Sequence, residues 1–202
     1  MNYRAAGSRC AVDFQSLALP ISQQEALSLL VVEGFRKIDV DIVALAKARI
    51  GTSEYRRSAR SREAPAVLDC SSLIKWLYAQ RGIWLPRRSI QQREYGEAVL
   101  PQEIVAGDVV FTSGMIDYYF DDPSDGVGHV GIATGAGTII HAANRKIGVV
   151  ECSLESFAHG RWFRGARRYV PADRDIITLE TPPDREVETE DDIRWIVLQF
   201  LR

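Results

Sequence analysis

Long apolar runs, closely spaced cysteines and a large net charge are all missing from this chain of 202 residues. No window approaches the ~18 consecutive apolar residues of a membrane span, and Asp13 and Gln15 interrupt any signal-peptide core near the start. We therefore expect no membrane span and no export signal. This predicts a cytoplasmic location, with export by a signal-independent route as the alternative.

The cysteine content is equally restrictive. Cys10, Cys70 and Cys152 are an odd number of widely spaced thiols, without the close pairs of a zinc site or a disulfide framework. Such free thiols suit a reducing compartment. A formal net charge of -2 argues against a protein whose whole surface binds nucleic acid. The one basic cluster, over residues 56–62, either keeps a loop hydrated or faces a bound acidic group.

The length and the 46% hydrophobic content predict one globular domain with appendages. We expect a helical extension over residues 1–37, the main domain over 38–172, and an acidic linker with an amphipathic helix over 173–202. Thr189 and Asp192 are expected to cap that last helix, which either docks on the domain or binds a partner.

Capping residues and apolar spacing predict helices over about residues 23–33 and 39–50, and a third that begins at Asp69 or Cys70 and ends at Gly82. After residue 107 the pattern changes to short β-branched runs separated by Gly, Asp and Asn, which indicate consecutive antiparallel strands. Helices followed by a meander predict an α+β domain, with the helices packed on one face of an antiparallel sheet.

Cys70 has two possible roles at the start of the third helix. It shares a helix face with Leu73, Ile74 and Leu77, which is typical of a small buried hydrophobic residue. A helix N-terminus also stabilises a thiolate, which is the reactive form of cysteine. The helix alone leaves both packing and nucleophilic catalysis open.

A nucleophilic cysteine needs a base, and His129 and His141 fall on adjacent predicted strands. If Gly135–Gly137 form a three-residue loop, residue 131 pairs with residue 141, and the two histidines become diagonal neighbours on one face. A two-residue loop would send His141 to the opposite face. Each histidine could also be an ordinary half-buried residue. A zinc site is a further alternative, but no fourth ligand is evident, so we expect no metal and no cofactor.

Several motifs occur in a defined order: "LDCSSLIKWLYAQRGIWLPRRSIQQ", "VAGDVVF", "GHVGIATGAGTIIHA" and "GARR". Together they resemble the NlpC family of bacterial cell-wall cysteine endopeptidases, which has a minimal papain-like fold, over about residues 38–170. The resemblance implies that Cys70 is the nucleophile, His129 the general base and His141 the polar residue that orients His129. The oxyanion is expected to meet the Cys70 backbone amide, with help from the Tyr55 hydroxyl.

Members of that family typically hydrolyse the bond between γ-D-Glu and a diamino acid in peptidoglycan stem peptides. Some hold a free L-Ala amine with an aspartate before the cysteine, a serine after it and a loop tyrosine, and Asp69, Ser71 and Tyr55 match these positions. Their simpler roles are a helix cap, a first-turn residue and packing. Arg56 and Arg57 stand where the family usually has a glycine-rich turn, and we expect them to pair with substrate carboxylates.

Two further departures from the family pattern stand out. Ser72 replaces the usual glycine two residues after the cysteine. The stretch "TSGMIDYYFDDPSDGV", within residues 112–128, is longer than usual, and its aromatic residues Tyr118, Tyr119 and Phe120 form either a lid over the site or an anchor for a surface loop.

The expected partner is a peptidoglycan-derived peptide, with no nucleic acid, and the sequence indicates no oligomeric state. Two other functions remain open. One is a catalytically silent module that binds peptidoglycan peptides, against which the intact Cys70, His129 and His141 set argues. The other is a cysteine amidase or acyltransferase that acts on an amide outside the cell wall.

Overall fold

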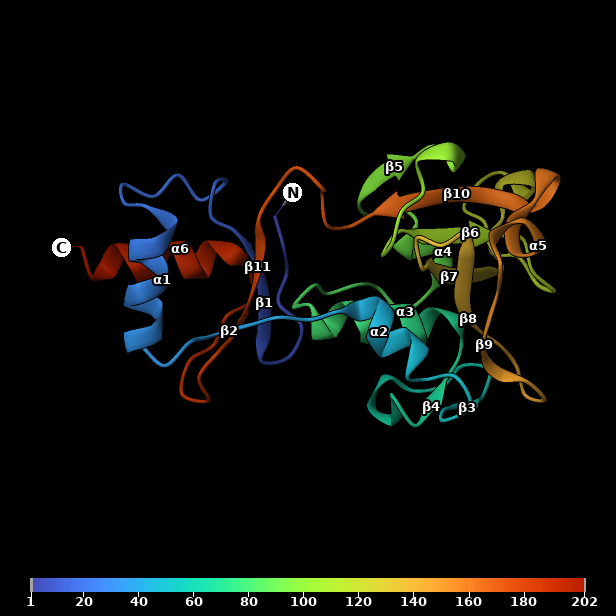
Figure 1. Cartoon of the computed structure of the whole chain (residues 1–202), viewed down its shortest axis with the longest axis horizontal. Helices are drawn as coiled ribbons and strands as arrows, with labels where there is room; N and C mark the ends of the chain where they lie inside the picture. Colours follow the sequence, from blue (N-terminus) through green and yellow to red (C-terminus); the bar gives the residue numbers. More distant parts are fainter. Residues whose placement is uncertain (1, 202) are drawn as a thin grey trace. The chain divides into compact units, whose positions relative to one another are not determined.

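The computed structural model describes residues 2–201 and divides into two compact units, each with its own hydrophobic core. Helices and antiparallel sheets are both present, as the predicted α+β class requires (Figure 1). Unit 1 comprises the chain up to Val40, Tyr78–Trp84 and the chain from Val170 onward, and unit 2 comprises Asp41–Leu77 and Leu85–Tyr169.

Unit 2 contains the predicted meander. Its strands are β3 (Glu54–Tyr55), β4 (Val67–Leu68), β5 (Glu97–Val99), β6 (Val109–Thr112), β7 (His129–Ala133), β8 (Thr138–Asn144), β9 (Gly148–Ser153) and β10 (Phe163–Arg168). Six of them form one antiparallel sheet in the order β5-β10-β6-β7-β8-β9, and β3 pairs with β4 in parallel (Figure 1). The consecutive strands β6 to β9 are neighbours in the sheet, which confirms the prediction.

The helices of this part of the chain range from 4 to 11 residues, and the longest ends within the Tyr78–Trp84 segment of unit 1. They are α2 (Ile42–Lys47), α3 (Cys70–Gln80), α4 (Ser89–Gln92) and α5 (Leu154–Ala158), with 3₁₀ turns at Ser61–Glu63, Pro101–Glu103, Pro123–Asp125 and Gly160–Trp162. Helix α2 starts later than the predicted 39–50, because the Asp41 side chain caps its start by accepting hydrogen bonds from the amides of Val43 and Ala44, and it ends at Lys47.

The hairpin between β7 and β8 has the register on which the histidine prediction depends. Ile132 pairs with Ile140, as the three-residue loop Gly135–Gly137 requires. Both loop glycines adopt positive φ angles, +82° and +75°, which glycine reaches without steric cost. The prediction that His129 and His141 lie diagonally on one face of the sheet is therefore confirmed.

Cys70 is positioned by the cap of α3. The Asp69 carboxylate accepts a hydrogen bond from the Ser72 amide at 2.8 Å, and the Ser72 hydroxyl accepts one from the Asp69 amide at 2.8 Å. This reciprocal arrangement fixes the first turn, confirms the capping role of Asp69 and gives Ser72 a structural function. The pairing of Tyr55 with Leu68 brings β3 alongside the residues that precede the cysteine.

Unit 1 combines the two ends of the chain. Its elements are α1 (Gln23–Val32), α6 (Glu190–Gln199) and the strands β1 (Arg9–Asp13), β2 (Arg36–Ile38) and β11 (Ile176–Glu180). The strands form an antiparallel sheet in the order β1-β11-β2. The core is formed by apolar residues from the sheet and both helices, among them Val12, Leu30, Phe35, Leu179 and Ile193.

The ends of the chain differ from the sequence expectation in two respects. Strand β11 occupies residues that were expected to be an acidic linker, and its Leu179 is buried. The segment expected to be a helical extension also contributes two strands. The C-terminal helix is capped by Thr189, as expected, whose amide donates to the Asp192 carboxylate at 2.9 Å. It buries Ile193 and Val197 in unit 1, so it docks within its own chain.

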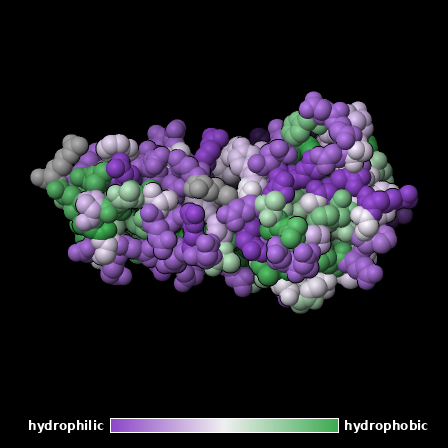
Figure 2. Space-filling model, turned by 90° about the horizontal axis from the view of Figure 1, so that it is seen from above, coloured by the Kyte–Doolittle hydropathy of each residue, from purple (hydrophilic) through white to green (hydrophobic). Residues whose placement is uncertain are grey.

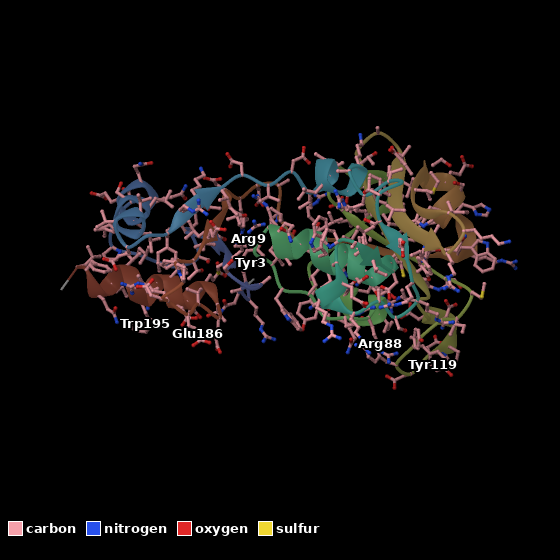
Figure 3. The ribbon with its side chains drawn as sticks, turned by 90° about the horizontal axis from the view of Figure 1, so that it is seen from below. Tyr3, Arg9, Arg88, Tyr119, Glu186 and Trp195 are labelled. Atoms are coloured by element: carbon pink, nitrogen blue, oxygen red, sulfur yellow. The ribbon has the colours of Figure 1, made fainter. Side chains whose placement is uncertain are left out.

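The surface is largely hydrophilic, with separate hydrophobic patches on both units (Figure 2). Exposed apolar side chains of unit 1 include Val32 and Trp195, the second of which projects from α6 (Figure 3). None of the helices within residues 2–201 has the length and apolar character needed to cross a membrane.

Candidate active site

A pocket of about 760 Å³ in unit 2 brings together most of the residues predicted to form a site. One wall comes from the N-terminus of α3, another from β7 and β8, and a third from the loop that follows β6. The predicted residues that line it are Tyr55, Arg57, Asp69, Cys70, Ser71, His129 and His141.

The two histidines form a fixed pair. Nε2 of His129 lies 2.7 Å from Nδ1 of His141, and the rings meet edge to face with 4.9 Å between their centroids. Phe157 packs against both rings, at centroid distances of 5.4 Å and 4.9 Å. Because Nε2 of His129 is engaged by His141, Nδ1 is the nitrogen of His129 left to exchange a proton with another group.

Burial keeps both imidazoles neutral. Burial, the larger effect, and the neighbouring His141 together lower the pKa of His129 to about 4, against the opposing effect of Asp69. Burial likewise lowers the pKa of His141 to about 4. At neutral pH both rings therefore lack the extra proton, as a general base must.

Cys70 is half-buried in this pocket. Burial, the largest effect, and the charge of Asp69 raise the pKa of its thiol to about 11, against the opposing effects of hydrogen bonds from the amides of Ser71 and Val130 and the charge of Arg87. Burial thus outweighs the helix N-terminus, and the resting sulfur carries its proton. A reactive sulfur then requires proton transfer to a base during the reaction itself.

Arg87 is a site residue to which the sequence interpretation gave no role, although it stands in the quoted motif "LPRRS". Its guanidinium donates to the Ser71 hydroxyl at 2.8 Å, to the Ala59 carbonyl at 2.6 Å and to the Asp69 carboxylate. Asp69 is buried and serves Arg87 and the helix cap together. Arg87 therefore holds the side chains of Asp69 and Ser71 in position at the pocket.

The basic loop contributes less than the sequence suggested. The guanidinium of Arg56 pairs with the Glu63 carboxylate, and Arg56 does not line the pocket. The charge of Arg56 is thus compensated at the surface, and the pairing of Arg56 with a substrate carboxylate stays a prediction. Arg57 does line the pocket, as does Arg88, whose guanidinium lies 4.9 Å from the centre of the Tyr118 ring.

The long stretch within residues 112–128 forms a wall of the pocket. Asp117 holds its start by accepting hydrogen bonds from the Ser113 hydroxyl and the Gly114 amide. Tyr118 lines the pocket and its backbone pairs with Val127. Tyr119 is exposed and does not line the pocket (Figure 3). Of the aromatic residues proposed for a lid, Tyr118 alone lines the cavity.

Comparison with known proteins identifies the family. The model of the NlpC/P60 family matches residues 51–168, more than half of the chain. The chain belongs to the NlpC/P60 family. This confirms the resemblance seen in the motifs.

The similar proteins agree with this assignment. The γ-DL-glutamyl hydrolase of Bacillus subtilis is 31% identical over 71% of this chain and 33% of its own length. The γ-D-glutamyl-L-lysine dipeptidyl-peptidase of Bacillus cereus is 31% identical over 51% of this chain and 29% of its own length. The chain thus spans about a third of the length of these two relatives.

A solved structure supports the fold as well. The crystal structure of an NlpC/P60 family protein from Bacillus cereus is 26% identical, covers 65% of this chain and 40% of that one, and aligns with a TM-score of 0.51. Structural neighbours of this kind are papain-like, so the papain-like α+β fold predicted from the sequence is confirmed.

The NlpC/P60 pocket holds one more thiol that the sequence interpretation did not use. Sγ of Cys152, on β9, lies 3.4 Å from Nε2 of His141 and lines the same cavity. Among residues 2–201, the His, Cys, Asp and Glu side chains form no group of three or more that could hold a metal ion.

Proposed function

We propose that this chain is a cysteine peptidase that hydrolyses an amide bond in peptidoglycan stem peptides, between γ-D-Glu and a diamino acid. The names of the two bacterial relatives, a γ-DL-glutamyl hydrolase and a γ-D-glutamyl-L-lysine dipeptidyl-peptidase, support the choice of bond. The observation that carries the proposal is the pairing of His129 with His141 in the pocket that also holds Cys70.

In the first half of the reaction, His129 acts as a general base. Its neutral Nδ1 takes the proton of the Cys70 thiol as the sulfur attacks the carbonyl carbon of the scissile amide. The carbonyl electron pair moves to oxygen, where the Cys70 backbone amide at the helix N-terminus and the Tyr55 hydroxyl stabilise the oxyanion. Positive charge on His129 and negative charge on the reacting group form together. Their mutual attraction offsets the desolvation free energy that burial would impose on either charge alone.

In the second half, the same imidazole works in reverse. Protonated His129 gives its proton to the leaving amine as the carbon–nitrogen bond breaks, and a thioester on Cys70 remains. His129 then takes a proton from a water molecule, whose oxygen attacks the thioester. The new carboxylic acid leaves, and the proton returns to the Cys70 sulfur. His141 keeps its contact with His129 Nε2 throughout, so the base does not rotate away.

The substrate is held by the acidic and the basic sides of the pocket. In this proposal Asp69, Ser71 and Tyr55 receive a free L-Ala amine, and Arg57 pairs with a substrate carboxylate. Since Asp69 also pairs with Arg87, its charge is partly compensated.

The test is cleavage of L-Ala-γ-D-Glu-diaminopimelate by the full chain, followed by mass spectrometry. The wild type is expected to release the L-Ala-γ-D-Glu dipeptide, and Cys70→Ala is expected to release none. The same peptide with an acetylated L-Ala amine is expected to react much more slowly, because acetylation removes the charge that Asp69 attracts. Arg56→Ala serves as a matched control, since Arg56 lies outside the pocket.

The outcomes separate the parts of the proposal. Equal cleavage by wild type and Cys70→Ala would show that Cys70 is not the nucleophile. Equal cleavage of free and acetylated peptide would leave the nucleophile in place and reject the amine site.

A further inference from the structure

Cys152 contacts His141 on the ring nitrogen that does not face His129. Its Sγ lies 3.4 Å from Nε2 of His141, a distance within the range of a hydrogen bond to sulfur, while Nδ1 of His141 faces His129. The three side chains thus form one line of contacts: Cys152, His141, His129. Cys10, by contrast, is fully buried in the core of unit 1.

The register of β8 and β9 explains this contact. His141 pairs directly with Val150, and Ile139 pairs with Cys152. Cys152 is two residues beyond Val150, so it lies on the same face of the sheet as His141 and diagonally across from it. Phe157, which follows β9 on α5, closes the space beside both imidazole rings.

The proton positions along this line are linked, because each contact needs one donor and one acceptor. A general base must keep Nδ1 of His129 unprotonated, so a neutral His129 carries its proton on Nε2 and donates it to Nδ1 of His141. A neutral His141 must then carry its own proton on Nε2. That proton points at Sγ of Cys152, which accepts it.

The opposite arrangement is unproductive. If His141 carries its proton on Nδ1, it donates to Nε2 of His129, and a neutral His129 must then be protonated on Nδ1. A ring in that state cannot take the proton of Cys70. Selecting one tautomer of His141 therefore selects the working tautomer of His129.

We propose that Cys152 is a positioning residue of this site, whose sulfur accepts the Nε2 proton of His141 and so holds His129 in the tautomer that can act as a base. The inference rests on the proposed function, because it takes His129 as the base. Its structural consequence, the tautomer of His141, can be measured without any substrate.

The test uses the full chain labelled with ¹⁵N-histidine, in which long-range ¹H–¹⁵N correlation spectra show which ring nitrogens carry protons. The chain contains three histidines, and a His159→Gln variant removes the signal of the third. In the wild type we expect both His129 and His141 to be protonated on Nε2. In Cys152→Ala we expect His141 to shift toward protonation on Nδ1, and in Cys152→Ser, whose hydroxyl can accept the same proton, to return to Nε2.

Kinetics on the cleavable peptide give the second readout. Loss of one hydrogen bond of ordinary strength predicts a decrease in kcat of about 3- to 10-fold for Cys152→Ala, with KM unchanged and with recovery in Cys152→Ser. Cys10→Ala removes the same atom outside the pocket and is expected to leave both the spectra and kcat as in the wild type.

The two readouts distinguish the possible failures. Protonation of His141 on Nδ1 in the wild type, or an unchanged tautomer and kcat in Cys152→Ala, would overturn the role of Cys152. The expected tautomers in a protein that cleaves no peptide would leave the contact intact and reject the proposed function instead.

Discussion

At the scale of single residues, burial sets the chemistry of the pocket. It raises the pKa of the Cys70 thiol and lowers the pKa of His129, so the resting site is uncharged at both positions. In the proposed mechanism the ionised pair forms as the reaction begins, and the surrounding groups have to stabilise it at that moment. The hydrogen bond between His129 and His141 holds the proposed base in a fixed orientation.

The pH dependence of the reaction follows from the His129 pKa of about 4. In the proposed mechanism the active form is the neutral imidazole, which is present above the folded-state pKa and lost as the pH falls through it. We therefore expect kcat/KM to stay high at pH 5 and to fall near pH 4. Measurement of kcat/KM between pH 4 and 8 tests this, and a half-maximal value at pH 6.5 or above would contradict it.

Stability must be followed in the same experiment. Because the unfolded histidine binds protons below about pH 6.5 while the buried one does not, the unfolded state gains protons first, and stability decreases as the pH falls from that value toward 4. Circular dichroism at each pH separates unfolding from protonation of the base.

Arg87 gives a second prediction at this scale. Arg87→Ala leaves the buried Asp69 carboxylate without its cationic partner, which we expect to lower the free energy of unfolding by about 2–3 kcal/mol, less than a fully buried pair because Arg87 is partly exposed. Urea denaturation measures the change. Arg57→Ala provides the control, since Arg57 is exposed and its loss should change stability by no more than about 0.5 kcal/mol. Equal stabilities of the two variants would contradict a structural role for the Arg87–Asp69 pair.

At the scale of elements, turns place the functional groups. The three-residue loop between β7 and β8 sets the register that makes the histidines neighbours, and the cap of α3 orients the cysteine. In unit 1, the turn at Gly82 after α3 similarly positions a neighbouring strand. The carbonyl of Gly82 accepts a hydrogen bond from the Ala11 amide of β1 at 2.9 Å.

Gly82→Ala tests that turn. Gly82 has a φ angle of +77°, and an added Cβ would lie 2.5 Å from the carbonyl carbon of Cys10, which is backbone and cannot move aside easily. We expect a loss of more than ~2 kcal/mol in the free energy of unfolding, measured by denaturant titration. Gly7→Ala is the matched control in the same unit: its φ angle is +63°, but a Cβ there meets nothing within 4 Å. A Gly82→Ala cost no larger than that of Gly7→Ala would contradict the close approach.

At the scale of the whole molecule, the family match and the structural units divide the chain differently. The match to the NlpC/P60 family covers residues 51–168, almost all of which lie in unit 2. Unit 1 gathers both ends of the chain around a three-stranded sheet, and its α6 buries its apolar face there. The pocket therefore lies in unit 2, and most of unit 1 lies outside the family match.

The sequence predicts the parts of the site that local rules control. Alternation and the glycines around residue 136 reduce the register of His129 and His141 to two alternatives, of which the structure has the three-residue loop, and the position of Asp69 before the helix predicts its capping role. Strand β11 was not predicted, because its pairing with β1 joins residues more than 160 positions apart, which no local pattern encodes. The place of Cys152 in the site was not predicted for a related reason. Its contact with His141 depends on the register of β8 and β9, which includes an irregularity after Ala142.

The central claim, that Cys70 forms a covalent intermediate, is tested most directly by trapping that intermediate. The protein is mixed with L-Ala-γ-D-Glu-diaminopimelate, quenched in acid at short times and analysed by intact mass and peptide mapping. The account predicts an added L-Ala-γ-D-Glu acyl group on Cys70 in the wild type and none in Cys70→Ser. Product release with no acyl group on Cys70 at any time, or the same turnover in Cys70→Ser, would contradict it.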